Sequence, residues 1–275
     1  GLARPMMVVA TPREDATVIL AMDVSGSMRA TDVSPTRLDA AKASALSFID
    51  QLPAGVRVGI VSFASEPVTL VTATTDRVQL RNAINGLTAR DGTAMGDALM
   101  QVLDIAHQIQ TAGTEKLDAS PTPGASAAPG SPALPGTPAK QPLVAAILLS
   151  DGANSVGQAK PLDAAQRAKT LGVPIYTIAL GTPQGTVGVQ DQFGQTVTLR
   201  VPPDTATLKQ IASITGATAF DAPTAKDLSS VYDNLQTRVG YTEERQEVTF
   251  ALVGTGLLLV LVGAGLSAVW FGRLP

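Results

Sequence analysis

The chain has 275 residues, of which 45% are hydrophobic and 16% charged, and its formal net charge is -3. A charge this close to neutral gives no sign of nucleic-acid binding. The sequence has no cysteine and one histidine, His107, which is predicted as a helix residue rather than a catalyst. Disulfides and cysteine nucleophiles are therefore excluded. A Ser-His-Asp triad and a zinc site with imidazole ligands are disfavoured, because the sequence has only this one histidine.

Residues 1–15 are predicted as a lead-in to the domain. The run from Thr17 to Met22 is rich in β-branched and long aliphatic side chains, which is typical of a strand buried on both faces. Ser34 as cap and Pro35 as first helical residue predict a helix through about Leu52. Val56 to Phe63 is the next expected strand.

Pro67 to Val71 is predicted as a short edge strand, because proline cannot donate to a sheet ladder, and an antiparallel direction is one option. Thr75 is expected to cap a helix over 76–85, and a long helix follows over 94–111. Residues 113–142 consist mostly of Pro, Ala, Gly, Ser and Thr, so they are predicted as a disordered insertion within the domain. Their PxxP-like spacings leave a polyproline ligand open as an alternative.

Strands and helices continue to alternate after this insertion. The expected elements are a strand over 143–150, a helix over 161–171, a strand over 175–180, a small hairpin within 181–203, a helix after Asp204 to Thr215, a strand over 217–220 and a helix over 224–240. This alternation predicts an α/β fold with a doubly wound, mostly parallel sheet and helices on both faces. Neither GxxxxGK[ST] nor GxGxxG occurs, which argues against nucleotide binding.

Val248 to Phe271 forms a stretch of about 24 residues without a charged side chain. At about 1.5 Å per residue, such a helix spans a hydrocarbon core of about 30 Å, whereas a buried core helix is the alternative. Trp270 suits the membrane interface and Arg273 follows it, while residues 243–247 before the stretch are mainly acidic. These flanks predict a cytoplasmic carboxyl terminus and a folded domain outside the cytoplasm.

Polar residues follow directly after two of the predicted apolar strands. Asp23, Ser25 and Ser27 alternate after the first strand, and Asp151 follows the strand over 143–150. The carboxyl ends of parallel strands share one edge, where open α/β sheets bind ligands. Carboxylates and hydroxyls suit Mg²⁺, Mn²⁺ or Ca²⁺, with Mg²⁺ the first choice. The alternative is that these residues only cap the turns that follow.

Three motifs occur in a fixed order: the DxSxS segment over 23–27, Gly92-Thr93 before a helix, and Asp151-Gly152 after a strand. Together they resemble the von Willebrand factor type A (VWA) family with its metal-ion-dependent adhesion site. The resemblance covers residues 16–240, so we expect a single VWA domain over this range.

The resemblance also implies which residues hold the ion. Ser25 and Ser27 would bind it directly and Thr93 in one conformational state, whereas Asp23 and Asp151 would bind directly or through water. An Asp or Glu of a partner protein would take the remaining coordination position. Asp97 is expected to have a structural or outer-shell role, and Asp32 and Asp91 to be solvated loop acids.

The function favoured by these features is a membrane-anchored, metal-dependent protein-binding module without catalytic residues. It resembles bacterial Bat-type proteins, which accompany MoxR-type AAA+ ATPases in the cell envelope and often carry one or two spans before the domain, here upstream of Gly1. The alternative is a structural subunit of a membrane complex, in which an ion only stabilises the loops.

Overall fold

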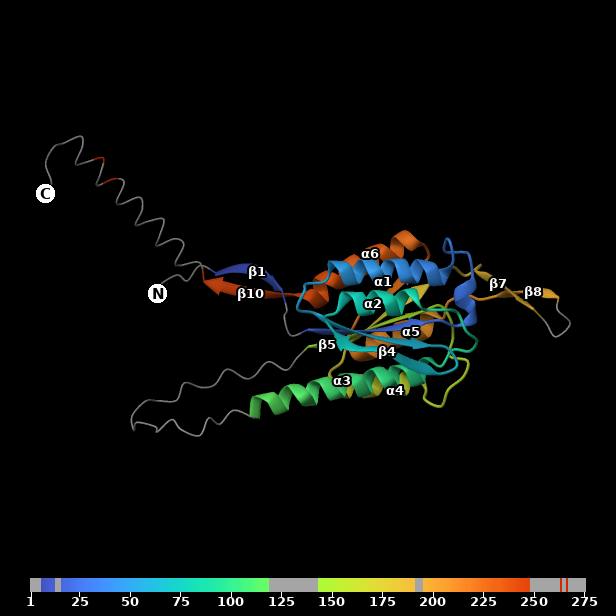
Figure 1. The fold of residues 1–275 in the computed structure, drawn as a ribbon, viewed down its shortest axis with the longest axis horizontal. Coiled ribbons are helices and arrows are strands. Elements are labelled where there is room, and N and C mark those ends of the chain that lie inside the picture. Colours follow the sequence, from blue (N-terminus) through green and yellow to red (C-terminus); the bar gives the residue numbers. More distant parts are fainter. Residues whose placement is uncertain are drawn as a thin grey trace. The chain divides into compact units, whose positions relative to one another are not determined.

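The computed structural model describes residues 6–12, 16–118, 143–190 and 195–247, together with Gly263 and Leu266. It divides into two units, one formed by residues 13–240 and the other by residues 1–12 and 241–275. The larger unit contains a six-stranded sheet in the order β4-β3-β2-β5-β6-β9 (Figure 1). Its strands are β2 (Thr17–Asp23), β3 (Arg57–Phe63), β4 (Pro67–Thr74), β5 (Val144–Ser150), β6 (Ile175–Leu180) and β9 (Ala219–Ala222).

The central strand of this sheet is β2, which is buried along its whole length. It pairs in parallel with β3 on one side and with β5 on the other, and β6 and β9 extend the parallel array. At the opposite edge β4 runs antiparallel to β3, with Pro67 opposite Phe63. The predicted parallel sheet and the edge strand with its antiparallel option are both confirmed, although β4 continues past Val71 to Thr74.

Helices cover both faces of the sheet, as predicted (Figure 1). They are α1 (Arg37–Gln51), α2 (Arg77–Asn85), α3 (Met95–Asp118), α4 (Pro161–Leu171), α5 (Thr205–Thr215) and α6 (Ala225–Gly240). Alternate residues of β2 point to opposite faces of the sheet. Leu20 packs in the core beneath α1, α2 and α6, and Ile19 packs in the core beneath α3, α4 and α5. This alternation follows from the two-residue period of a strand.

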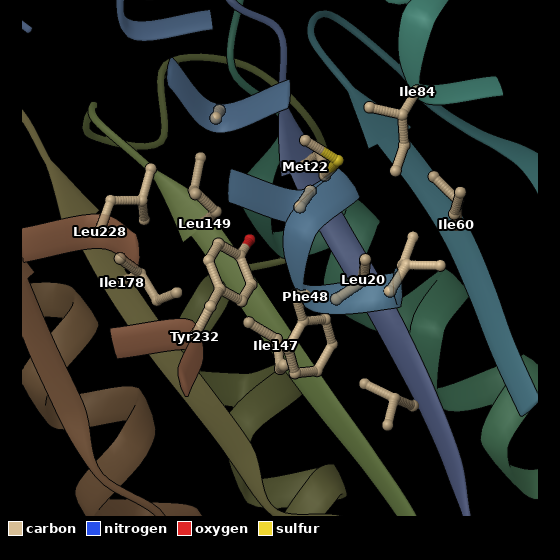
Figure 2. Packing of buried hydrophobic residues seen from close by; sticks show 14 of the residues in the cluster. Leu20, Met22, Phe48, Ile60, Ile84, Ile147, Leu149, Ile178, Leu228 and Tyr232 are labelled. Atoms are coloured by element: carbon tan, nitrogen blue, oxygen red, sulfur yellow. The ribbon is translucent and has the colours of Figure 1, made fainter. Parts of the chain in front are cut away.

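The core beneath α1 and α6 contains an aromatic pair, Phe48 and Tyr232, whose ring centroids lie 5.1 Å apart. Figure 2 shows both rings packed near Ile147 and Leu149 of β5. Within the part of the chain that the structure describes, the Tyr232 hydroxyl is buried and has no hydrogen-bond partner. Burial raises the pKa of this phenol well above its usual range.

Helices α1 and α2 begin later than the sequence indicated, and α3 and α6 each begin one residue later. Helix α1 starts at Arg37, because the Thr36 hydroxyl accepts a hydrogen bond from the Asp39 amide and so forms the cap. The prediction that Pro35 is the first helical residue was wrong, and Pro35 instead follows a cis peptide bond. Helix α2 starts at Arg77, capped by the carboxylate of Asp76 rather than by Thr75.

Other boundaries differ as well. Helix α3 continues beyond Thr111 to Asp118, because Glu115, Lys116 and Leu117 are good helix formers. The predicted insertion therefore begins with helical residues, and positions 119–142 lie outside the described residues. The last strand of the sheet, β9, begins at Ala219 instead of Ala217.

A small hairpin leaves the end of the sheet where the parallel strands finish (Figure 1). Its strands are β7 (Thr186–Gln190) and β8 (Thr196–Arg200), which pair antiparallel with Val187 opposite Leu199. The hairpin expected within residues 181–203 is therefore confirmed, and residues 191–194 between its strands lie outside the described residues.

The smaller unit contains a strand pair that the sequence analysis missed. β1 (Met6–Pro12) runs antiparallel to β10 (Tyr241–Glu247), with Met6 opposite Glu247. The predicted span over 248–271 lies outside the described residues, apart from Gly263 and Leu266. Among the described residues, no helix has the length and apolar character needed to cross a membrane.

Candidate metal centre

The polar residues at the ends of β2 and β5 form one hydrogen-bonded chain. The Ser25 amide donates to Asp23 Oδ1 over 2.8 Å, and the Ser25 and Ser27 hydroxyl oxygens lie 2.9 Å apart. The Ser27 hydroxyl then donates to Asp151 Oδ1 over 2.7 Å. Because β2 and β5 are parallel neighbours, their carboxyl ends bring these distant residues together.

Thr93 lies at the side of this chain of contacts. A Cβ atom added to Gly152 would be 3.6 Å from Ser27 Oγ and 3.9 Å from Thr93 Oγ1, so both hydroxyls approach the same glycine. The Thr93 amide donates to the hydroxyl of Ser155 over 3.0 Å. All five residues implied as metal ligands therefore lie in one cluster.

Both carboxylates of the cluster are fully buried. Burial, reinforced by the nearby Asp151, raises the pKa of Asp23 to about 7, although hydrogen bonds from Ser150 and Ser25 oppose the shift. Burial also raises the pKa of Asp151, against the effect of hydrogen bonds from Ser27 and Arg37. Two buried carboxyl groups that repel each other electrostatically favour the presence of a cation.

The Asp151 carboxylate has a cationic neighbour that the sequence analysis did not identify. The guanidinium of Arg37 is 0% exposed and donates from Nη1 to Asp151 Oδ2 over 2.7 Å. A signal was available, because Arg37 stands four positions before Ala41 and so on the buried face of α1. Its partner, 114 positions further along the chain, could not be read from the sequence.

Asp32 was expected to be a solvated loop acid, and this prediction was wrong. Arg37 donates to both of its carboxylate oxygens, from Nε over 2.8 Å and from Nη2 over 2.7 Å. The Thr182 amide adds a third hydrogen bond of 2.7 Å. Burial raises the pKa of Asp32, but the hydrogen bonds from Arg37 and Thr182 outweigh it and lower the pKa to about 2.

The other two acidic residues occupy the environments that were predicted. The Asp97 carboxylate accepts hydrogen bonds from the amides of Gln158 and Ala159, which is a structural role in the loop after Asp151. The Asp91 side chain is 94% exposed, and its nearest charged partner, Arg29, lies 3.6 Å away. Asp91 is therefore solvated.

The donor atoms of the cluster suit a hard divalent cation. Two carboxylates and three hydroxyls offer oxygen only, and within the described ranges no three His, Cys, Asp or Glu side chains gather into a metal-binding group. Hard oxygen donors select Mg²⁺, Mn²⁺ or Ca²⁺ over softer metals. The buried position of Asp23, which raises its pKa, also agrees with a carboxylate that needs a cation beside it.

A doubly wound sheet with this oxygen cluster at its carboxyl edge defines a VWA domain, and residues 18–117 match the von Willebrand factor type A domain family. The solved BatB structure from Bacteroides thetaiotaomicron has the same fold, with a TM-score of 0.58 and 21% identity over 80% of this chain and 97% of that chain. A mussel byssus protein, proximal thread matrix protein 1, matches with a TM-score of 0.53 and 17% identity over 87% of this chain and 50% of its own. That structure is described as having a zinc-occupied MIDAS motif.

The chain belongs to the UPF0353 family. It is 33% identical to a UPF0353 protein of Nocardia farcinica over 282 residues, which cover 99% of this chain and 78% of that protein. The similarity thus extends beyond the VWA motifs to nearly the whole sequence.

Proposed function

We propose that this chain is a divalent-metal-dependent protein-binding module. Its ion is held by the five clustered residues, Asp23, Ser25, Ser27, Thr93 and Asp151. The observation that supports this most strongly is the unbroken hydrogen-bonded chain from Asp23 through both serines to Asp151, with the Thr93 hydroxyl beside it. A bound cation supplies attraction for an anionic oxygen, most simply the Asp or Glu carboxylate of a partner protein.

The hydrogen bonds around the cluster orient its oxygen atoms for binding a cation. Ser27 gives its proton to Asp151 and so accepts from the Ser25 hydroxyl, which leaves one lone pair of the Ser27 oxygen available to a cation. Asp23 is fixed at both oxygens, by the Ser25 amide and by the Ser150 hydroxyl at 2.5 Å. Ser150 is a further supporting residue, and its place directly before Asp151 was its only signal in the sequence.

Mg²⁺ is the proposed ion, with Mn²⁺ or Ca²⁺ as alternatives. The zinc in the mussel protein shows that its own site accepts that metal. The donors of this chain are all oxygen, whereas zinc sites in proteins are usually built with nitrogen or sulfur ligands. We therefore expect zinc to be a weaker competitor here.

The proposed role is binding and not catalysis. The sequence contains no cysteine, and its one histidine, His107, is exposed on α3. The clustered hydroxyls and carboxylates act as ligands, and their hydrogen bonds hold them in position instead of activating a nucleophile.

The proposed setting is the bacterial envelope. Residues 248–271 form the membrane anchor, and residues 16–240 form the VWA domain, placed outside the cytoplasm, with 113–142 as an insertion within it. The uncharged length of the anchor segment and the fold shared with BatB support this arrangement. By the same resemblance, the system includes a MoxR-type AAA+ ATPase or other Bat-type proteins.

The metal site is tested by calorimetric titration of Mg²⁺ and Mn²⁺ into the full chain in detergent, beside the Asp23→Ala variant. We expect saturable binding by the wild type and none by the variant. A wild-type chain that binds neither ion would contradict the proposed function.

A second experiment separates recognition from a purely structural ion. Peptides displayed on phage are selected on the immobilised chain, with Mg²⁺ or with a chelator. Recognition predicts that Asp- or Glu-containing peptides are enriched only with Mg²⁺, and that Thr93→Ala keeps its thermal stability but loses them. If the ion only stabilises loops, Thr93→Ala lowers the melting temperature and leaves peptide selection unchanged.

A further inference from the structure

Arg37 occupies a site that is built around its guanidinium. Gly181, with a φ of 110°, and Gly185 both face this group, and a Cβ atom at either position would overlap it. Only glycine at these positions leaves the space that the guanidinium fills. The fold therefore accommodates a buried arginine at this point.

The contacts of Arg37 fix the orientation of the Asp151 carboxylate. Arg37 Nη1 holds Oδ2 at 2.7 Å, and the Ser27 hydroxyl holds Oδ1 at the same distance. With both oxygens engaged, the carboxylate cannot rotate without breaking a hydrogen bond in a buried site. Arg37 therefore keeps Asp151 Oδ1 in place as the acceptor for the Ser27 hydroxyl.

The same guanidinium reaches the base of the β7–β8 hairpin. Its Nη2 donates to the carbonyl oxygen of Val201 over 3.0 Å, just after β8. Its partner Asp32 accepts from the amide and the hydroxyl of Thr182, before β7, over 2.7 and 3.0 Å. Arg37 and its partner Asp32 therefore connect Asp151 with both ends of the hairpin segment.

We propose that Arg37 is a positioning residue of the metal centre, which holds the Asp151 carboxylate toward Ser27 and joins it to the base of the β7–β8 hairpin. Its effect on ion affinity rests on the proposed function, whereas its effect on Asp151 and the hairpin does not. Arginine suits this role because its planar group carries five N–H donors in a fixed fork, whereas the three donors of lysine lie on one nitrogen and cannot reach acceptors on opposite sides.

A purely stabilising ion pair is the competing explanation, and it accounts for less of the geometry. Burying charged groups carries a desolvation penalty that can exceed their attraction, so a buried ion pair is weak evidence of stabilisation. Residues that orient metal ligands from behind, by contrast, typically change metal affinity by about 10- to 100-fold when they are replaced.

The test compares Arg37→Lys with Arg77→Lys in the full chain. Arg77 is a matched control, because its Nη2 is hydrogen-bonded to the carbonyl oxygens of Pro53 and Val56, at the start of β3 and so at the other end of the sheet. Mn²⁺ affinity is measured by electron paramagnetic resonance titration. We expect Arg37→Lys to weaken binding about 10- to 100-fold and Arg77→Lys to leave it unchanged. Equal affinities of wild type and Arg37→Lys would overturn the proposal.

Hydrogen–deuterium exchange without metal provides the second measurement. In Arg37→Lys, exchange should increase together in residues 150–156 and in residues 181–186, but in neither segment for Arg77→Lys. If exchange around Asp151 is unchanged, Arg37 does not position it and the proposal fails. Because this measurement needs no metal, it still tests the role of Arg37 if the wild type binds no ion. Failure to bind an ion would contradict the proposed function but not the positioning of Asp151 by Arg37.

Gly185→Ala serves if Arg37→Lys does not fold. The added methyl group would overlap Arg37 Nη2 and come within 2.6 Å of Asp32 Oδ2, which displaces the guanidinium without removing a charge. We expect the same joint increase in exchange and the same direction of change in Mn²⁺ affinity. A folded Gly185→Ala chain with wild-type values in both measurements would overturn the proposal.

Discussion

Thr93 and Ser155 are held to each other by two reciprocal hydrogen bonds. The Thr93 amide donates to the Ser155 hydroxyl over 3.0 Å, and the Ser155 amide donates to the Thr93 carbonyl oxygen over 2.9 Å. These bonds join the segment before α3 to the loop after Asp151. The position of the Thr93 hydroxyl is therefore set by a loop that also carries a proposed ligand.

Replacing Ser155 tests this connection. In Ser155→Ala the Thr93 amide loses its acceptor, so we expect unfolding in urea to show a loss of about 1 kcal/mol, with weaker Mn²⁺ binding. Ser230→Ala is the control, since its exposed hydroxyl bonds only within α6, to the Lys226 carbonyl oxygen. Unchanged Mn²⁺ affinity in Ser155→Ala would show that this pair does not position Thr93.

The loop after Asp151 also packs closely on the start of α3. A side chain at Gly96 would overlap the carbonyl oxygen of Ala159. We expect Gly96→Ala to lower the free energy of unfolding by about 1 to 3 kcal/mol, because the loop must shift to admit a methyl group. Gly86→Ala is the control, because its added Cβ would be no closer than 3.4 Å to a neighbour and its φ of -73° suits alanine. Equal melting temperatures of Gly96→Ala and wild type would contradict the packing argument.

The raised pKa of Asp23 predicts a pH dependence of stability without metal. Its folded-state pKa of about 7 exceeds its ordinary value of 3.8, so its contribution is fully present below pH 3.8 and is lost as pH rises through 7. We expect the melting temperature of the metal-free chain to fall across this window, and to fall less in Asp23→Asn. Asp32 acts oppositely, because its contribution is lost as pH falls from 3.8 toward 2. A wild-type melting temperature that rises between pH 4 and 7 would contradict the assignment to Asp23.

The same shift predicts that metal binding releases a proton. Near pH 6 the Asp23 carboxyl is mostly protonated and must ionise as the cation binds. Calorimetry of Mg²⁺ binding in two buffers of different ionisation enthalpy should show proton release at pH 6 and little at pH 8.5, with tighter binding at the higher pH. Binding without proton release at either pH would contradict this expectation.

The buried hydroxyl of Tyr232 leads us to predict that its removal stabilises the core. Because this hydroxyl has no hydrogen-bond partner among the described residues, Tyr232→Phe removes an uncompensated polar group and keeps the ring against Phe48. We expect the free energy of unfolding to increase by about 1 kcal/mol. Tyr176→Phe, at a half-buried position, should change it little. A clear loss of stability in Tyr232→Phe would indicate a partner for the hydroxyl.

Much of the fold could be predicted because its signals are local. The apolar run of β2, the proline that begins α4 and the Asp204 cap of α5 each depend on a few adjacent residues, and the structure has them where they were expected. Asp23, Ser25, Ser27 and Asp151 could also be found, since parallel strands must end at the same edge, whereas Thr93 was implied only by the resemblance to the VWA family. Helix starts were less reliable where two neighbouring residues can each cap, as at Thr75 and Asp76.

Contacts that depend on the tertiary fold could not be predicted. Asp32 was judged from its loop setting, but a buried arginine on α1 changes its charge environment. The pairing of β1 with β10 joins residues 6–12 with residues 241–247, and residues 243–247 gave no alternation strong enough to indicate a strand. For the strand pair the partner lies far away in the chain, where local patterns carry no information. Arg37 is only five positions from Asp32, but its burial against the sheet depends on the tertiary fold.

The pairing of β2 with β5 has a consequence for how the protein is made. Ser150, at the end of β5, follows Asp23 by 127 positions. At about 5 to 20 residues per second, the ribosome delivers β5 several seconds or more after β2. During that interval the nascent chain has an apolar strand with one open edge, which is a site for chaperones or for aggregation. A truncated translation product that stops before β5 therefore keeps that edge and carries only one of the two buried carboxylates.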